Sequence, residues 1–379
     1  MFEILFWIMI SAILYVYLGY PLLLMVLVFL RPSRPIPNPS GSLPTISLLI
    51  SAYNEEECIR KKIVNSLEID YPRDLIEIAV VSNSSDRTNA VVGEYADKGI
   101  RLIVPPQPGK FAAQNYALPM LNGEIVIVTD ADTFCAPDSV KRLVKHFADK
   151  KVGCVVAKVD WTNSGDNVIT QGGSLYYSYE LFIRKKESDL GILGLGSTGL
   201  MGFPKRLFTP TPVFLAEDTF LPLLFLGKGY RVIYEPDSIA VTRATSNAEG
   251  EFRVRKRNAN IDTSAMFYMR SLLNPFKYPL PFLMLASHKI GRWLVPFLML
   301  GLFILNFFLP GKPLYRGLLT LQILFYSVTM LSFLLSLFGL RIKYLFIPYY
   351  FCLINIAASA GFIKAVFGNK QTSWEPVRA

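Results

Sequence analysis

Histidine and cysteine are scarce in this sequence, which has two histidines and four cysteines among 379 residues. No two cysteines are spaced as CxxC, and neither histidine stands at a metal-ligand spacing from a cysteine. Structural zinc sites need such clusters, so we expect no zinc. Free thiols in a reducing compartment are the simpler interpretation of the four cysteines.

An extended basic region of the kind that binds nucleic acid is also missing. The whole chain carries a net charge of +10, yet the stretch from Thr45 to Lys277 has 28 basic and 27 acidic residues. The remaining basic excess flanks long apolar runs. That placement is typical of helix-end anchors and lipid headgroup contacts, so we expect membrane lipids and no nucleic acid as partners.

Charge is absent from four long runs: Ile4 to Leu30, Trp293 to Gly311, Gly317 to Leu340 and Tyr344 to Ile363. A helix needs about 20 apolar residues to cross the hydrocarbon core. The runs predict one N-terminal span and two or three C-terminal spans. The first run lacks the basic start and the cleavage site of a signal peptide, so we interpret it as a retained span. Lys277 to Arg292 mixes apolar and basic residues and predicts an interfacial helix.

The region between the apolar runs alternates strand-like and helix-like segments. The predicted strands are 45–51, 76–82, 100–104, 125–129 and 153–158, and the predicted helices are 55–67, 86–98, 111–121 and 137–149. This alternation predicts an α/β domain with a mostly parallel sheet. Ligands bind beyond the carboxyl ends of strands in such sheets, so the polar segments that follow the strands should converge there.

A pair of acids closes one of these strands, in the segment IVIVTDAD. Asp130 and Asp132 are two residues apart, so in an extended chain they point to one face. Oxygen ligands of this kind suit Mg²⁺ or Mn²⁺, which hold phosphates through one or two carboxylates. The functional hypothesis is a metal–diphosphate site, and the alternative is a solvated Asp-containing turn.

Three further segments follow strand ends and allow two interpretations each. Ser51–Glu55 could hold a nucleobase with its aromatic ring, or contain an ordinary Asn cap. Ser82–Thr88 could hold a base and ribose, or supply an Asp N-cap to the next helix; both can be true. Gly109–Lys110 could place a cation near a diphosphate at a helix start.

Three segments in the second half complete the candidate site. Glu217 and Asp218 precede an apolar helix and could include a general base, since acids beside an apolar wall have raised pKa values; the alternative is N-capping. Arg253–Arg257 is a basic cluster that could clamp leaving phosphates or bind headgroups. Gly194–Gly202 is glycine-rich without the GK[ST] of a P-loop, and could let backbone approach a sugar.

Taken in order, these segments resemble the inverting nucleotide-sugar glycosyltransferases of family 2. They are most similar to the membrane-embedded branch with cellulose, chitin, hyaluronan and poly-N-acetylglucosamine synthases. The resemblance runs from about Tyr20 to Arg378 and rests on SAYNEE, SNSSDRT, GKFAAQN, TDAD, GSTGLMGFPKRLF, AED, SHKIGRW and the closing WEPVR. It implies a GT-A fold, which is a Rossmann-like α/β domain with a mostly parallel sheet.

The resemblance also implies residue roles. Uridine would be held by Ala52, Tyr53 and Glu55, with Asn83 and Asp86 beside it. Lys110 would meet the diphosphate, and Asp132 with Asp130 would hold Mg²⁺ or Mn²⁺. Asp218, next to Glu217, would be the base. Gly199 belongs to the acceptor loop, Arg253 and Arg257 to the basic cluster, and Trp374 to a tail that folds over the active site.

The sequence departs from the family pattern at two places. Asn83 replaces an acid, in a segment one residue short. In the Q-x-x-R-W signature of processive enzymes, Arg257 matches the Arg but Asn258 replaces the Trp and Val254 the Gln. Single addition and processive synthesis therefore both stay open.

The expected organisation is a transmembrane helix at 1–31, a cytosolic GT-A domain at 44–276, and an interfacial helix with a C-terminal transmembrane region at 277–379. The expected activity is transfer of a sugar from a nucleotide sugar, with UDP as the expected nucleotide, to a glycan or lipid-linked acceptor at the cell membrane. A non-catalytic nucleotide-sugar-binding scaffold and a transporter component are the alternatives. The intact DAD and ED segments favour the enzyme.

Overall fold

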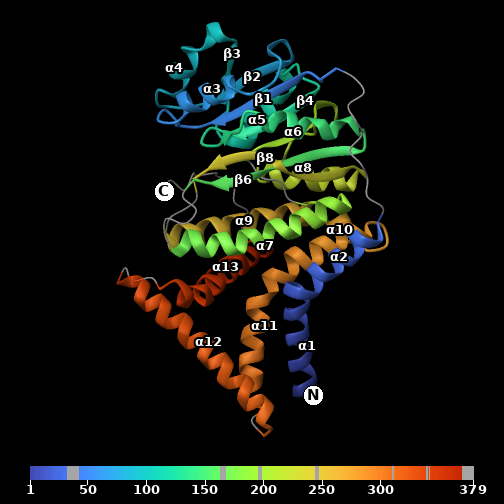
Figure 1. The fold of residues 1–379 in the computed structure, drawn as a ribbon, viewed down its shortest axis with the longest axis vertical. Helices are drawn as coiled ribbons and strands as arrows, with labels where there is room; N and C mark the ends of the chain where they lie inside the picture. The colour runs from blue at the N-terminus through green and yellow to red at the C-terminus, as the bar shows by residue number, and fades with distance from the viewer. Residues whose placement is uncertain are drawn as a thin grey trace.

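The computed structural model describes residues 1–31, 42–162, 168–194, 199–243, 247–309, 311–338, 340 and 342–368. For residues 168–175 and 343 it describes the backbone alone. The described chain forms an α/β domain at one end and a set of long apolar helices at the other, with the N-terminus at the far end from the sheet (Figure 1).

The α/β domain is built on an eight-stranded sheet with the order β3-β2-β1-β4-β7-β6-β8-β5. The strands are β1 Ile46–Ala52, β2 Ile76–Ser82, β3 Ile100–Ile103, β4 Ile125–Asp130, β5 Phe134–Cys135, β6 Val152–Trp161, β7 Met201–Pro204 and β8 Arg231–Thr242. β1 pairs in parallel with β2 and β4, and β6 with β8, whereas β7 runs antiparallel between β4 and β6. The five strands predicted from the sequence are present, and β5, β7 and β8 are additional.

Both faces of the sheet are covered. Leu48 and Ile50 of β1 belong to one hydrophobic core, and Leu49 between them belongs to the other. Burial on both faces explains why these strands are continuous apolar runs rather than alternating ones. The smaller helices are α3 Ile59–Leu67, α4 Thr88–Gly93, α5 Lys110–Ala117, α6 Ser139–Val144 and α8 Glu217–Gly227.

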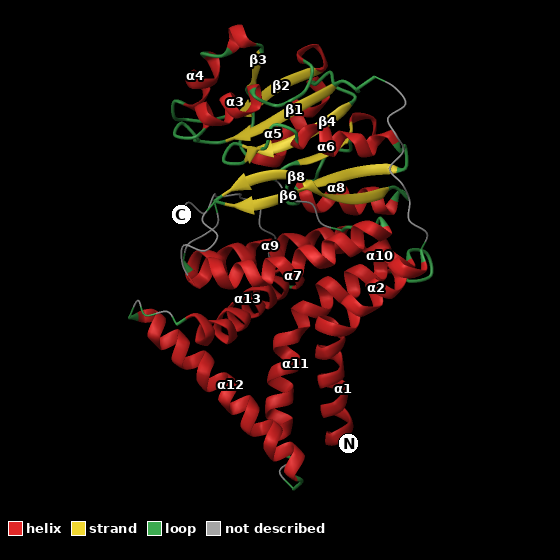
Figure 2. Ribbon diagram, viewed as in Figure 1, coloured by secondary structure: helices red, strands yellow, loops and turns green. Residues whose placement is uncertain are grey.

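Two long helices, α7 (Val168–Leu190) and α9 (Ala248–Tyr268), lie between the sheet and the apolar helices (Figure 2). The apolar helices are α1 Phe2–Leu14, α2 Tyr20–Leu30, α10 Pro279–Met284, α11 Gly291–Asn306, α12 Pro313–Leu337 and α13 Lys343–Val366. π-helical turns join α1 to α2 and α10 to α11. Four helical stretches in the described chain are long and apolar enough to cross a membrane: 2–30, 279–306, 313–337 and 344–366.

The apolar helices and the α/β domain share one hydrophobic core. Tyr20 and Trp293 from the apolar helices are buried in the same cluster as Leu49 and Val126 from the sheet. A hydrogen bond of 2.7 Å from the Tyr20 hydroxyl to Glu187 Oε1 adds a buried polar contact. The segment 277–292, predicted to be an interfacial helix, continues into α11 as one helical stretch from Pro279 to Asn306.

Candidate active site

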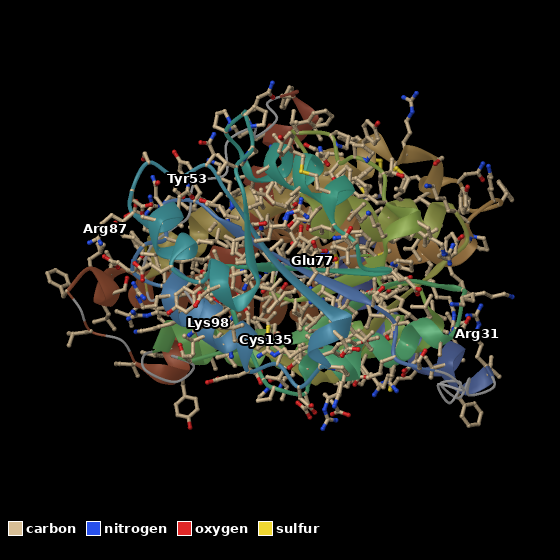
Figure 3. All side chains as sticks on the ribbon, turned by 90° about the horizontal axis from the view of Figure 1, so that it is seen from above. Arg31, Tyr53, Glu77, Arg87, Lys98 and Cys135 are labelled. Atoms are coloured by element: carbon tan, nitrogen blue, oxygen red, sulfur yellow. The ribbon has the colours of Figure 1, made fainter. Side chains whose placement is uncertain are left out.

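The polar strand ends predicted to converge do lie together. Ser51 of β1 stands opposite Asp130 of β4, and Ala52 stands opposite Ser82 of β2. Figure 3 shows Tyr53 and Arg87 at one end of the domain and Arg31 at the other. The strand ends open into a cleft of about 530 Å³. Its lining includes Ser51, Ala52, Tyr53, Glu55, Asn83, Gly109, Lys110, Asp130, Asp132 and Val213.

The first two loops at the cleft are joined by Asn54, which does not act as the ordinary cap considered from the sequence. Asn54 adopts a positive φ of 55°, and its side-chain Oδ1 accepts from the Ser85 backbone N–H at 2.9 Å. Its own N–H donates to Ser84 Oγ at 2.8 Å. This pairing holds the two loops at a fixed separation and leaves Tyr53, 46% exposed, at the mouth of the cleft.

Asp86 does not line the cleft, and its carboxylate is used by its own loop and by the loop after β1. It accepts hydrogen bonds from the Thr88 N–H at 2.9 Å and from the Glu56 N–H at 3.2 Å. Burial acts to raise the pKa of Asp86, but these hydrogen bonds outweigh burial and hold the pKa below its usual value. Asp86 thus bonds the first N–H of α4, while the N-cap position of that helix is Arg87.

Lys110 connects the two acidic segments of the site. Its Nζ lies 2.6 Å from Asp130 Oδ1 and 3.3 Å from Glu217 Oε1, and the side chain is only 6% exposed. Burial alone lowers the pKa of a lysine, but the charges of Asp130 and Glu217 reverse the effect and raise the pKa of Lys110 above its usual value. A permanently charged ammonium therefore stands between the DAD turn and the start of α8.

The two DAD carboxylates fit a divalent ion that is shared with a phosphate ligand. No group of three His, Cys, Asp or Glu side chains suited to a metal occurs among the described residues. Asp132 is exposed at the cleft, yet desolvation and the charge of Asp130 raise its pKa, and Lys110 offsets this only in part. Mg²⁺ and Mn²⁺ accept one or two carboxylates when phosphate and water complete the shell. Asp130 and Asp132 would hold such an ion together with a diphosphate.

A buried lysine, not singled out in the sequence, supports the DAD turn from beneath. Lys62 is fully buried on α3, and its Nζ donates to Thr129 Oγ1 at 3.0 Å and to the Thr133 carbonyl. Thr129 Oγ1 in turn donates to the Gly199 carbonyl at 2.7 Å. Lys62 thus links α3, the DAD turn and, through Thr129, the predicted acceptor loop at Gly199.

We expect Lys62→Met to weaken metal affinity by about tenfold or more, because groups that orient ligands typically contribute 10–100-fold. The Mn²⁺ concentration for half-maximal nucleotide binding measures this effect. Lys61→Met, on the exposed side of the same helix, is the matched control. Equal Mn²⁺ requirements in both variants would show that the lysine acts on folding alone.

Glu217 and Asp218 differ in their surroundings at the start of α8. Glu217 is 3% exposed, and its Oε1 contacts Lys110 and accepts from Gln114 Nε2 at 3.0 Å. Asp218 is half-buried, and burial together with Glu217 raises its pKa to about 7, although Lys110 acts in the opposite direction. An acid that titrates near neutral pH is suited to general base catalysis, and Asp218 has that property.

Gln114 is a site residue that the sequence analysis missed. It follows Lys110 by four residues on α5, so the two side chains lie on one face of the helix. Gln114 Nε2 also donates to Ser51 Oγ at 3.0 Å. The i, i+4 spacing from Lys110 was the available signal for this residue.

The four remaining predicted residues have different surroundings. Arg257 lies within electrostatic range of Asp218 and Asp130, and burial lowers its pKa. Arg253 is exposed, pairs with Glu249 at 3.9 Å and does not line the cleft. Gly199 is anchored to β4 through Thr129. Trp374 lies outside the described residues.

A family of known sequences matches the part of the chain that forms this site. Residues 47–208 match the model of glycosyl transferase family 2. A beta-monoglucosyldiacylglycerol synthase of Trichormus variabilis is 34% identical over 173 residues, covering 44% of this chain and 37% of that protein. An N-acetylglucosaminyltransferase of Rhizobium meliloti is 27% identical over 238 residues, covering 55% of each protein. The chain thus spans between about a third and about half of the length of these relatives.

The fold has a solved counterpart. The mannosyltransferase PcManGT from Pyrobaculum calidifontis, solved in complex with GDP-Man and Mn²⁺, aligns with a TM-score of 0.71 and 24% identity, covering 96% of this chain and 99% of that one. Residues 47–208 are thus similar to glycosyl transferase family 2, and the architecture of the described chain is a GT-A fold with four long apolar helical stretches. The predicted fold class is confirmed.

Proposed function

We propose that this protein is an inverting, metal-dependent glycosyltransferase that transfers a hexose from a nucleotide sugar to an acceptor at a membrane. The contact of Lys110 with both Asp130 and Glu217 carries the proposal. It joins a carboxylate of the proposed metal site to Glu217 through a buried cation. Glu217 is the neighbour of the proposed base, Asp218, whose pKa is raised. The similarity of residues 47–208 to family 2 supports the same chemistry.

In the proposed reaction Asp218 accepts the proton of an acceptor hydroxyl. The hydroxyl oxygen bonds to the anomeric carbon from the face opposite the diphosphate, while the bond from that carbon to the diphosphate oxygen breaks. The nucleoside diphosphate leaves with the electron pair, and the anomer is inverted. Lys110 and Arg257 stabilise the developing negative charge in a partly dry site. A divalent ion at Asp130 and Asp132 would supply further neutralisation of the diphosphate.

The proposed donor is a UDP-sugar, bound with its base against Tyr53 and Asn83 at the mouth of the cleft. The proposed acceptor is lipid-linked or a growing glycan, because the site is built onto helices suited to a bilayer. The proposed location is the cell membrane with the catalytic domain in the cytosol, where nucleotide sugars are present. Membership of the polymer-synthase branch is part of the proposal and would be decided by product length.

The test uses full-length protein in nanodiscs and radiolabelled UDP-glucose, UDP-N-acetylglucosamine, UDP-galactose and GDP-mannose. We expect one UDP-sugar to label a lipid-extractable or polymeric product in the presence of Mn²⁺, with no labelling in EDTA. Sizing the product separates one addition from many. Nucleotide binding without nucleotide release or sugar transfer from any of the donors would favour a non-catalytic scaffold instead.

The raised pKa of Asp218 predicts the acidic limb of the pH profile. A base must be deprotonated, so kcat/KM should fall tenfold per pH unit below about 7. Asp262 is one of the charges that raise this pKa, and Thr219 Oγ1 lies between the two acids, 3.0 Å from Asp262 Oδ1 and 3.5 Å from Asp218 Oδ1. Asp262→Asn keeps the Thr219 hydrogen bond and removes the charge. We therefore expect its acidic limb to move to lower pH, and an unmoved limb would contradict Asp218 as the titrating base.

A further inference from the structure

The last apolar helix, α13, is long enough to cross a bilayer, and the sequence predicts two or three C-terminal spans. Its apolar stretch, Tyr344–Val366, has 23 residues. In the structure it lies beside α7 and α9, whereas α1, α11 and α12 extend away from the sheet (Figure 1). Its most apolar part is 39% buried, against 6% for α12. Length and composition therefore do not decide its position.

The helix α9 sets the depth at which α13 can lie. α9 bears charges along most of its length: Glu249, Glu251, Arg253, Arg255, Lys256, Arg257 and Asp262. Asp262 also accepts a hydrogen bond at 3.0 Å from Thr219, the residue that follows Asp218. Several charges on one helix are too costly to place in the hydrocarbon core. α9 must lie outside that core, on the side of the catalytic domain.

α13 runs alongside α9 in the same direction. Near the start of both helices, the Tyr350 hydroxyl donates to Glu251 Oε1 at 2.8 Å. Further along, Asn260 Nδ2 donates to the Gly361 carbonyl at 3.3 Å. These contacts are eleven residues apart on α13, which is about 16 Å of helix. Because α13 contacts the charged helix α9 over that length, the two helices must lie at the same depth relative to the membrane.

The two faces of α13 fit an interfacial position. One face carries the buried residues Phe346, Tyr350, Ile354, Ala357, Gly361 and Ala365. Asn355 and Ser359 are also buried, where they bond to Tyr17 and to the Trp293 carbonyl of the neighbouring apolar segments. The other side of the helix exposes Ile356 and Ile363, and Phe367 is exposed just beyond the helix end. That exposed face is too apolar for water alone, and it suits the boundary between headgroups and acyl chains.

We propose that α13 does not cross the membrane but lies in the bilayer interface on the catalytic side, with its exposed apolar face against lipid. The chain then crosses three times, through the first apolar stretch, α11 and α12. The N-terminus and the α11–α12 connection share the far side, which agrees with the 2.7 Å ion pair between Glu3 and Lys312. The chain leaves α13 at Phe367 on the side of the active site.

The distribution of basic residues agrees with this topology. Three crossings leave Lys312 and Arg316 on the far side and put Lys343 and Lys364 on the catalytic side. A fourth crossing would move Lys364 to the far side. Basic residues accumulate on the cytosolic side of membrane proteins, so the three-crossing arrangement fits a cytosolic catalytic domain better.

Labelling single introduced cysteines with a membrane-impermeant maleimide tests the proposal in right-side-out and inverted vesicles, in a background with the four native cysteines replaced. Lys98→Cys marks the catalytic side, and Gly311→Cys marks the α11–α12 connection. We expect Phe367→Cys to be labelled in the same vesicles as Lys98→Cys and Gly311→Cys in the opposite ones. Labelling of Phe367→Cys together with Gly311→Cys would overturn the proposal, whatever the enzymatic activity.

A glycine pair tests the contact itself. A Cβ at Gly361 would lie 2.2 Å from the Lys256 carbonyl oxygen, whereas a Cβ at Gly317 of α12 meets nothing within 4 Å. We expect Gly361→Leu to lower the Tm by several degrees and to expose α9 to protease, while Gly317→Leu behaves as wild type. Equal stability of the two variants would mean that α13 is not held against α9.

Discussion

Replacing Asp218 with Asn is expected to lower kcat for sugar transfer by about 10³-fold, because a positioned general base typically contributes 10²–10⁴-fold. Asn keeps the shape of the side chain and its place at the start of α8 but cannot accept the proton. Donor binding should be unchanged, since Asp218 does not line the donor cleft. Calorimetry with UDP and Mn²⁺ and single-turnover transfer assays measure the two quantities separately.

Asp218→Asn should also change the thermal stability of the protein. The pH dependence of that change tests whether the pKa of Asp218 is raised. The pKa of Asp218 is raised from 3.8 to about 7, so the native state holds this proton more tightly than the unfolded chain. The stability from the protonated acid is present below pH 4 and is lost as the pH rises through 7. Asn mimics the protonated form, so the Tm advantage of Asp218→Asn should grow between pH 4 and 7 and then stay constant.

Two results would contradict the assignment of the base. If Asp218→Asn keeps wild-type turnover at pH 8, the general base is another group, with Glu217 as the first alternative. A variant that loses UDP binding along with turnover would show a folding or donor-site defect. Asp237→Asn, on an exposed acid outside the cleft, is the control for the loss of one carboxylate.

Replacing Asp132 with Ala is expected to remove metal-dependent activity. One carboxylate, Asp130, would remain, and its 2.6 Å contact with Lys110 competes with an ion for the same oxygen. A metal that neutralises a transferring diphosphate contributes several kcal/mol, so we expect a fall in kcat/KM on the order of 10³-fold. UDP should bind Asp132→Ala equally well with and without Mn²⁺, whereas the wild type should bind UDP more tightly with Mn²⁺.

The control for Asp132→Ala is Asp160→Ala. Asp160 also lies at the carboxyl end of a strand, β6, and pairs with Lys158 at 2.9 Å, but it does not line the cleft. We expect its Mn²⁺ dependence to equal that of wild type. If Asp132→Ala retains the Mn²⁺ enhancement of UDP binding, the metal is held elsewhere and the proposed site is wrong.

Much of the α/β domain could be predicted from local sequence patterns. The strand at 76–82 was predicted to the residue, and β1 and β4 within one residue, because apolar runs bounded by polar turns specify buried strands. β7 was missed because it has only four residues, and nothing local indicates that it pairs antiparallel between β4 and β6. A strand as short as β7 can be identified only from its pairing with other strands, and those strands are distant in sequence.

The candidate site was predictable where function depends on strand ends and unpredictable where it depends on contacts between elements. Lys62 was not singled out in the sequence, yet it is fully buried under the DAD turn. Glu217 and Asp218 are adjacent in sequence, and only packing separates a partner of Lys110 from an acid whose pKa is about 7.

The sequence by itself determined where the strands end, which acids follow them and how many apolar stretches could reach across a bilayer, because these properties depend on neighbours a few residues apart. The tertiary structure alone decided that Lys110 joins Asp130 to Glu217 and that α13 lies against the charged helix α9. Charge pairing and depth in a membrane depend on contacts between residues that are 20 to about a hundred positions apart. Those contacts exist only once the chain has packed.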